Sequence, residues 1–173
     1  QTSRAIRWKP PVGETVKVNW DAAWMIDEYR CGIEVVIRDR CGEVLASLCC
    51  PKQNVADPAV AEIYALWRAM KLCVELNLSM VQLDGDALSV VQAVNNNAAS
   101  WDWNGQLIDG LKIVLKNRMH RAVLHVNRAC NSVAHSLAKS ALYVKEELVW
   151  MEDYPQEIRN LVEVDKVCNS TDS

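Results

Sequence analysis

Hydrophobic and polar residues alternate in the first third of the chain with the period of β-strands. Apolar side chains take every second position from Val16 to Trp20, which leaves Asp21 on the opposite side of the segment 16–24. Residues 32–39 are rich in β-branched side chains, and residues 43–50 alternate again after a glycine-containing turn signal. A period of two is typical of strands with one packed face, so three consecutive antiparallel strands are predicted.

Helical periodicity follows these strands. Asp57 and Pro58 are a capping residue and a first-turn proline, and the predicted helix runs to about Leu76. Its core-facing stripe falls on positions 62, 66, 69, 73 and 76. The first of these positions is Glu62, so a carboxylate stands where an apolar side chain is expected.

Beyond this helix the chain alternates between strand and helix. It is predicted to form a strand, two helices, a strand and a last helix at residues 79–84, 87–96, 106–117, 121–128 and 133–147. Asp86 lies at the first strand-to-helix junction, a loop is expected at 98–105, and Asn131 or Ser132 is the expected cap of the last helix. The order β-β-β-α-β-α-α-β-α predicts an α/β fold with a five-stranded mixed sheet: three antiparallel leading strands, then helical crossovers, with helices on both faces.

One domain is predicted to hold most of the chain, because 173 residues, half of them hydrophobic, suffice for a single core. Pro and Gly punctuation makes residues 1–14 a lead-in segment before a domain at 15–149. Residues 150–173 are expected to be a tail with a short helix at 155–162 and a disordered polar end. No heptad or apolar edge indicates a dimer, so a monomer is expected.

Amino-acid composition limits the partners and the cellular compartment that can be expected. Nineteen Lys and Arg against 22 Asp and Glu give a net charge of −3, so a nucleic-acid partner would have to meet a local basic patch. The seven cysteines lack zinc spacing, which favours reduced thiols and an intracellular, reducing compartment, with nucleus and cytoplasm not distinguished. No long apolar stretch or signal peptide indicates a membrane partner. The first residue is Gln, which is compatible with a piece of a longer polypeptide.

Three carboxylates, Asp21, Glu62 and Asp86, stand at core-facing or junction positions. An isolated buried charge is strongly unfavourable, so such groups are paired, protonated or bound to a cation. The set therefore indicates a divalent-metal site. Structural alternatives remain open: a turn cap for Asp21, a helix-dipole partner for Glu62 and a helix cap for Asp86. Asp84 is assigned such a structural or solvated role.

Five motifs occur in order along the chain: VNWDAAW, GIEVVIRDRCGEVL, AEIYALWRAM, LDGDALSVV and HVNRACNSVAHSLAK. Together they resemble the ribonuclease H fold, and most of all the plant branch of RNase H-like domains related to retroelement reverse-transcriptase polyproteins. The resemblance covers about residues 8–162. It implies an RNase H-like fold for the predicted sheet.

The resemblance also implies that Asp21, Glu62 and Asp86 are catalytic acids that hold two Mg²⁺ ions. In ribonuclease H enzymes a fourth acid lies four residues after an Asn. Asn131 matches that Asn, but the fourth position is His135, which predicts a poorer Mg²⁺ site that Mn²⁺ suits better. An earlier catalytic His of the family corresponds to His125, which is expected to move protons during product release.

Candidates for nucleic-acid contact are few. The densest basic stretch holds Lys112, Lys116, Arg118, His120 and Arg121, with Trp101 and Trp103 close by as stacking platforms. A solvated helix face with two half-buried indoles is the alternative. Arg128 and Asn131 complete the candidate set, with bracing of the last helix as their alternative role.

The function predicted from the resemblance is endonucleolytic hydrolysis of the RNA strand of RNA/DNA hybrids by a two-metal mechanism. The alternative is a catalytically weak or inactive RNase H-like module that binds nucleic acid or a protein partner, which His135 and the negative net charge favour. An ATPase-like relative is disfavoured, because the chain has no GxxxxGK phosphate loop.

Overall fold

A computed structural model describes residues 6–97, 103–117 and 121–170, apart from the side chains of Trp103 and Cys168. In this part of the chain, six strands form one mixed sheet in the order β5-β4-β1-β2-β3-β6. The strands are β1 (Val16–Met25), β2 (Arg30–Arg38), β3 (Val44–Gln53), β4 (Val81–Gly85), β5 (Arg121–His125) and β6 (Leu148–Met151). The predicted mixed α/β sheet is confirmed, with one more strand than expected.

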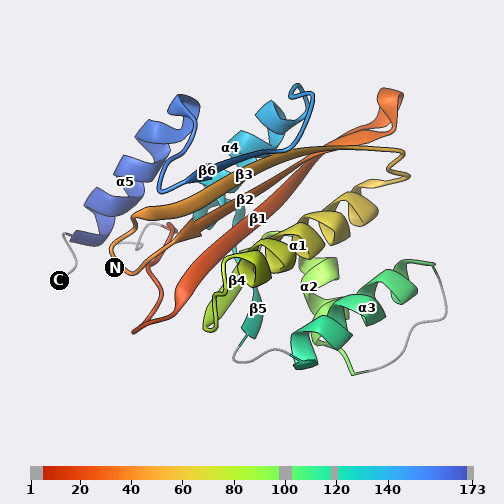
Figure 1. Ribbon diagram of the computed structural model, residues 1–173, viewed down its shortest axis with the longest axis horizontal. Helices are drawn as coiled ribbons and strands as arrows, with labels where there is room; N and C mark the ends of the chain where they lie inside the picture. Colours follow the sequence, from red (N-terminus) through yellow and green to blue (C-terminus); the bar gives the residue numbers. More distant parts are fainter. Residues whose placement is uncertain (1–5, 98–102, 118–120, 171–173) are drawn as a thin grey trace.

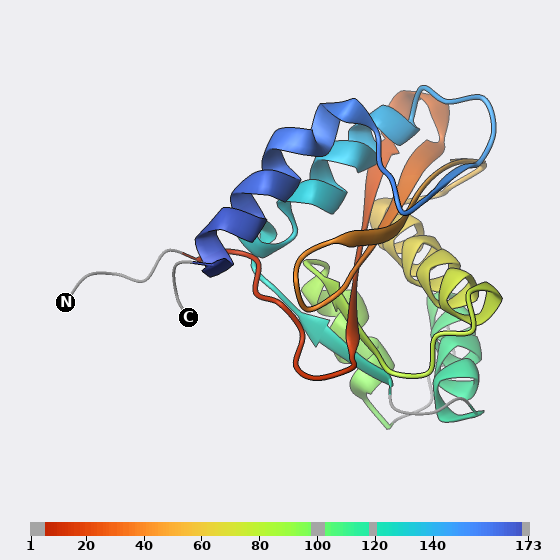
Figure 2. The ribbon, with the colours of Figure 1, turned by 60° about the vertical axis from the view of Figure 1, so that its left-hand side comes forward.

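Helices cover both faces of the sheet, as predicted. On one face lie α1 (Pro58–Glu75), α2 (Leu88–Asn95) and α3 (Trp103–Asn117), and on the other lie α4 (Ser132–Ala141) and α5 (Arg159–Ser170) (Figure 1). Short 3₁₀ turns occur at Ile26–Glu28, Arg128–Cys130 and Gln156–Ile158. In Figure 2 α4 and α5 run side by side, so each face of the sheet has its own helical layer.

The strand register places two of the predicted acids at one level. β1 is antiparallel to β2 but parallel to β4, and Asn19 is paired with Asp84. Asp21 and Asp86 each lie two residues further along, towards the carboxyl end of their strands. Side chains two residues apart share one face of a strand, so both acids are directed to the same edge region.

Two close approaches between elements depend on glycine. A Cβ at Gly32 in β2 would overlap the carbonyl oxygen of Ala138, so its absence lets α4 lie directly on the sheet. A Cβ at Gly85 would overlap the indole of Trp20, which is fully buried in the core on the α1 side. The first contact fixes how closely α4 lies on β2, and the second fixes how closely the end of β4 lies to β1, next to the carboxylates.

The last main helix is shorter than the predicted span 133–147. It ends at Ala141, and Leu148–Met151, just beyond the predicted helix, form β6, which pairs antiparallel with β3 over Ala46–Cys49. No local pattern indicated this strand, because the open edge of β3 is formed by residues about 100 positions earlier. Backbone hydrogen bonds to that edge stabilise residues 148–151 as a strand.

The tail also differs from its prediction. The polar end expected to be disordered continues as α5 to Ser170. Its buried face includes Ile158 at the preceding turn and Val162, and Asp165 forms a 2.7 Å ion pair with the buried Arg38 of β2. At the other boundary, α3 begins at Trp103, inside the predicted loop 98–105.

None of the helices in the described ranges is long and apolar enough to cross a membrane. The six cysteines whose side chains are described are free thiols. Burial raises the pKa of Cys31 and of Cys49 to about 12, so neither thiol is a reactive thiolate near neutral pH.

Candidate metal centre

Three elements bring the predicted acids together. Asp21 lies in β1, Asp86 directly after β4, and Glu62 in the second turn of α1. The start of α1 is fixed as predicted, because Asp57 accepts a hydrogen bond from the amide of Val60 at 3.0 Å. One carboxylate oxygen from each of the three acids lies within 4.8 Å of the others, so the side chains form a single cluster.

The electrostatics of this cluster call for a positive charge. Burial, and then the charge of Asp21, raise the pKa of Glu62 to about 9. Burial, and then the charge of Asp86, raise the pKa of Asp21. Oε2 of Glu62 is buried and has no hydrogen-bond partner. A divalent cation would satisfy that oxygen and relieve the repulsion, so these residues fit a metal site of hard oxygen ligands.

His135 contacts this cluster through Asp21. Its Nδ1 lies 2.8 Å from Oδ2 of Asp21, while Oδ1 accepts a hydrogen bond from the amide of Ala22 at 2.9 Å. When Asp21 is ionised, Nδ1 is the donor, and the imidazole then fixes the orientation of the carboxylate. Among the described residues, the side chains close enough together to share a metal ion are the three acids without His135. A ligand role for His135 therefore stays a prediction.

Arg128 supplies a cation to the third acid. Its Nε donates to Oδ2 of Asp86 at 2.8 Å, from a side chain that is 68% exposed. An exposed guanidinium can leave a carboxylate without a large desolvation change. Arg128 is therefore a movable counter-charge for Asp86 at the rim of the cluster. The predicted contact with nucleic acid stays a prediction.

Asn131 is buried beneath the cluster. It stands at the cap position of α4 but makes no capping bond, contrary to expectation. Its Oδ1 instead accepts from Nδ2 of Asn19 at 3.0 Å, and its Nδ2 donates to the carbonyl of Trp20 at 3.0 Å. These bonds join α4 to β1 next to Asp21, so Asn131 braces the last helix, the alternative role expected for it. Nucleic-acid contact by Asn131 stays a prediction that its burial opposes.

His125 is the last residue of β5 and is paired with Gly85. This places the exposed imidazole at the same edge of the sheet as Asp86, one residue beyond Gly85. The position suits contact with a bound substrate, while the proton-transfer role stays a prediction.

The predicted basic stretch lies at the opposite end of β5. Lys112, Lys116 and Arg121 line a shallow cavity of about 420 Å³. Arg121 begins the strand that His125 ends, so it is about 13 Å from the carboxylate edge at the usual rise per residue. Trp101, Arg118, His120 and the side chain of Trp103 lie outside the described residues.

Sequence reasoning missed one carboxyl beside the cluster. Glu34 is paired with Asp21 across β1 and β2, is fully buried, and has no hydrogen-bond partner on either oxygen. Burial, and then the charge of Asp21, raise its pKa well above the usual value. The only signal was a single acid within the β-branched run 32–39.

Asp84 has the structural role that its position suggested. It is buried, forms a 3.1 Å ion pair with Lys17 and accepts a hydrogen bond from Gln82 at 2.9 Å. The carboxylate is thus neutralised within the sheet and is separate from the cluster of three acids.

Comparison with known proteins places this geometry in a family. The profile described as reverse transcriptase-like matches residues 19–141, a range that includes all three acids and His135. No curated protein shows significant similarity to the chain.

Solved structures share the fold at low sequence identity. RNase H1 from the halophilic archaeon Halobacterium salinarum has a TM-score of 0.67 and 22% identity, over 74% of this chain and 97% of that one. LC11-RNase H1, isolated from compost by a metagenomic approach, was solved with an RNA/DNA hybrid and has a TM-score of 0.63 and 20% identity, over 73% and 96%.

The foamy viral protease-reverse transcriptase, also solved with an RNA/DNA hybrid, has a TM-score of 0.58 and 17% identity. The match covers 83% of this chain and 22% of that one. These similarities confirm the RNase H-like fold, and the profile match covers well over half of the sequence. The chain belongs to the reverse transcriptase-like family of RNase H-fold domains.

Proposed function

We propose that this protein is a metal-dependent endonuclease that hydrolyses the RNA strand of RNA/DNA hybrids. The observation that carries the proposal is the cluster of Asp21, Glu62 and Asp86, whose ligand oxygens lie within 4.8 Å of one another. Two structural neighbours, LC11-RNase H1 and the foamy viral enzyme, are known in complex with such hybrids. The shared fold and the acids support the same substrate here.

The three acids would hold two Mg²⁺ ions, with Mn²⁺ as the alternative. Bound ions of this kind activate a water and neutralise charge that develops on the phosphate and on the leaving oxygen. Asp21 contributes a carboxylate already oriented by His135 and the amide of Ala22. Ionisation of Glu62 must accompany metal binding, because the metal-free group has a raised pKa.

Two exposed residues would act on the substrate at the rim. Arg128 can exchange Asp86 for a phosphate once a metal takes that carboxylate, since a guanidinium binds both partners in the same geometry. His125 is placed to exchange a proton with the product at the same edge. Lys112, Lys116 and Arg121 would then meet a more distant part of the duplex.

We also infer a setting for the domain. The motif resemblance to plant retroelement domains supports a plant origin, and the match within the longer foamy viral chain supports residence in a longer polypeptide. We also propose an intracellular, reducing compartment, because the cysteines lack zinc spacing, and a monomeric state, because the sequence shows no heptad or apolar edge.

A second candidate is a catalytically weak or inactive module that binds nucleic acid or a protein. The observation that favours it is His135, which occupies the place of the fourth acid and is engaged with Asp21 at 2.8 Å. A site with three carboxylates binds Mg²⁺ less tightly than one with four, so occupancy at ordinary Mg²⁺ concentrations decides between the two candidates.

Cleavage of an end-labelled RNA/DNA hybrid in Mg²⁺ and in Mn²⁺ tests the first candidate. Asp86→Asn removes one ligand charge with little change in shape, and Asp27→Asn is the matched control at an exposed position of the β1–β2 hairpin. The proposal expects cleavage by the wild type and by the control, strongest in Mn²⁺, and its loss in Asp86→Asn.

Cleavage that survives Asp86→Asn would reject the assigned centre. Binding of the hybrid without cleavage in either metal would support the second candidate. Electron paramagnetic resonance of bound Mn²⁺ separates the remaining possibilities, because a protein that binds Mn²⁺ at the acids but leaves the hybrid intact has a formed but unproductive site.

A further inference from the structure

A buried chain of hydrogen bonds leads to the carboxylate cluster from the side of the sheet that carries α4 and α5. Its centre is Asn19, which is fully buried and lies two residues before Asp21 on the same face of β1. Oδ1 of Asn19 accepts from Nε1 of Trp8 at 3.0 Å and from Nη2 of Arg38 at 3.1 Å. Its Nδ2 donates to Oδ1 of Asn131 at 3.0 Å, so this one side chain joins β1 to three other segments.

The two donors at one end of the chain fix the orientation of both amides. An indole N–H and a guanidinium can only donate, so the oxygen of Asn19 must face them and its amide nitrogen must face Asn131. Asn131 then presents its own oxygen to Asn19, which turns its Nδ2 to the carbonyl of Trp20 at 3.0 Å. Trp20 directly precedes Asp21 in β1. The donors therefore determine, through two amides, how the backbone beside the first acid is held.

The same Asn131 precedes the helix that carries His135. Its carbonyl accepts a hydrogen bond from the amide of His135 at 2.9 Å in the first turn of α4. His135 in turn places its Nδ1 2.8 Å from Oδ2 of Asp21. Asn131 is thus bonded both to the backbone before Asp21 and to the turn that presents His135. A shift of this side chain would change the distance between the imidazole and the carboxylate.

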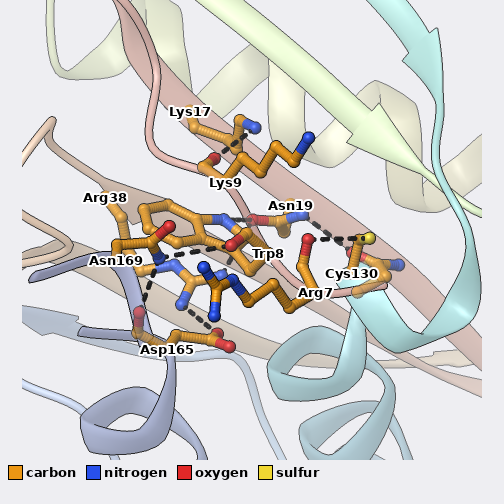
Figure 3. Close-up of polar contacts among 10 residues, drawn as sticks. Arg7, Trp8, Lys9, Lys17, Asn19, Arg38, Cys130, Asp165 and Asn169 are labelled. Carbon is orange, nitrogen blue, oxygen red and sulfur yellow. Dashed lines mark hydrogen bonds and ion pairs between the residues drawn. The ribbon is translucent and has the colours of Figure 1, made fainter. Parts of the chain in front are cut away.

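The donor Arg38 is enclosed by segments from the two ends of the protein. Its side chain is 1% exposed, and its Nη1 lies 2.7 Å from Oδ2 of Asp165 in α5. The centre of the Trp8 ring lies 3.9 Å from the guanidinium on its other side, as Figure 3 shows. A buried guanidinium without its counter-charge is strongly unfavourable. The ion pair with Asp165 therefore keeps Arg38 in position to donate to Asn19.

Two further bonds hold the backbone around Trp8. Nδ2 of Asn169 in α5 donates to the carbonyl of Trp8 at 3.2 Å, and the thiol of Cys130 donates to the carbonyl of Arg7 at 3.0 Å (Figure 3). Cys130 lies in the 3₁₀ turn that precedes α4. The N-terminal segment is therefore bonded to α5 on one side and to the approach to α4 on the other.

Two members of this network lie outside the residues that match the family profile. The profile covers positions 19–141, whereas Trp8 precedes this range and Asp165 follows it. Asn19, Arg38 and Asn131 are inside the range. The terminal segments of this chain therefore complete a hydrogen-bond network whose other members belong to the family domain.

We propose that Arg38, with Trp8 as the second donor, is a positioning residue of the metal centre, and that α5 holds it in place through Asp165. The inference rests on the proposed function for the metal centre that is positioned. The two amides, once oriented, keep His135 against Asp21. A carboxylate oriented in advance binds a cation more tightly, because less conformational freedom is lost on binding. Undocking of α5 therefore weakens metal binding through this chain of bonds.

The variants must separate positioning from simple stabilisation of the fold. Arg38→Met/Asp165→Leu replaces the buried ion pair by apolar side chains of similar size, an exchange that often leaves stability unchanged or raises it. It removes one donor to Asn19. Trp8→Phe removes the other donor and keeps both an aromatic ring and the ion pair, so it tests the chain even without a folded double variant. Lys166→Gln is the matched control, because it removes two surface ion pairs of α5.

Two measurements read the result. The Mn²⁺ affinity measured by electron paramagnetic resonance should fall by about fivefold in Arg38→Met/Asp165→Leu and in Trp8→Phe, the value of one lost hydrogen bond, and should stay at the wild-type level in Lys166→Gln. In the metal-free protein, the imidazole ¹⁵N chemical shifts of His135 should change in both variants and not in the control. These shifts report the contact of Nδ1 with the first acid, which thermal stability alone would not alter.

Wild-type Mn²⁺ affinity in both variants would overturn the inference, as would unchanged His135 shifts. An equal loss of affinity in Lys166→Gln would also overturn it, because the effect would then come from any loosening of α5. The proposed function fails separately. If the wild type cleaves the hybrid and the variants bind Mn²⁺ as well as it does, only the positioning is wrong. If the His135 shifts change in the variants but the wild type cleaves no hybrid in Mg²⁺ or Mn²⁺, only the nuclease is wrong.

Discussion

In the metal-free protein Glu62 holds a proton at neutral pH, because burial and the neighbouring charge of Asp21 raise its pKa to about 9. A divalent ion needs the ionised carboxylate, so metal binding must release this proton. The perturbations that expose the effect are a change of pH and the substitution Glu62→Gln. The substitution removes the titrating group but keeps its size.

The size of the effect follows from the distance between the working pH and the pKa. At pH 7 the group is about two units below its pKa of about 9, which corresponds to about 2.7 kcal/mol of binding free energy, or roughly 100-fold in affinity. Metal affinity should therefore rise by about tenfold per pH unit between pH 6 and pH 8. The raised pKa of Asp21 acts in the same direction.

The same pKa predicts the stability of the metal-free protein. Glu62 binds its proton more tightly when folded than at its ordinary pKa of 4.5, so its contribution to stability is complete below pH 4.5 and is lost as the pH rises towards 9. In EDTA the free energy of unfolding should decrease across this window. The decrease should be smaller in Glu62→Gln. Saturating Mn²⁺ should restore the stability of the wild type.

Calorimetric titration with Mn²⁺ at several pH values, in two buffers of different ionisation enthalpy, measures both affinity and protons released. Glu75→Gln is the matched control, because Glu75 is an exposed residue of the same helix and should retain the wild-type pH slope. Absence of proton release at pH 7, or a slope in Glu62→Gln equal to that of the wild type, would refute the reasoning.

Three further substitutions have expected outcomes. Arg128→Gln should raise Mn²⁺ affinity by roughly fivefold, the worth of about 1 kcal/mol for an exposed charge pair, because Asp86 loses a competing cation. A fall in the affinity measured by electron paramagnetic resonance would show that Arg128 supports the site instead. His135→Asp should increase Mg²⁺-dependent hybrid cleavage by adding a ligand, and an unchanged rate would remove position 135 from the metal shell. Asp165→Ala should lower the free energy of unfolding in urea by about 3 kcal/mol, because it leaves Arg38 buried and uncompensated, and a loss below about 1 kcal/mol would show that α5 is only loosely docked.

The three acids were predictable because each is marked by local sequence. Asp21 interrupts an alternating strand, Glu62 follows a cap and a proline at a fixed helical phase, and Asp86 lies at a strand-to-helix junction. Parallel pairing of β1 with β4 then brings the two aspartates to the same level of the sheet. Glu34 was missed because a single acid in a β-branched run carries no periodic signal.

The terminal parts of the fold depend on pairings that no local pattern reveals. Arg38 and Asp165 are 127 positions apart, and neither position shows that the other will be buried against it. The burial of Trp8 depends on that pair, because the indole lies on the guanidinium of Arg38. The polar tail therefore forms an ordered helix, and the lead-in is bonded to it through the carbonyl of Trp8. Polar composition indicated a disordered end for the tail, whereas residues 1–14 were expected only as a lead-in segment.

The replacement at position 135 changes the charge balance of the centre and not only its ligand count. Burial, and then repulsion from Asp21, already raise the pKa of Glu62 to about 9, and burial raises the pKa of the neighbouring Glu34. A fourth carboxylate at position 135 would raise that repulsion in the metal-free state. His135 instead donates to Asp21 and lowers it. Compared with a domain with four acids, this chain should bind metal less tightly but be more stable in the metal-free state. Its activity should therefore depend more steeply on metal concentration.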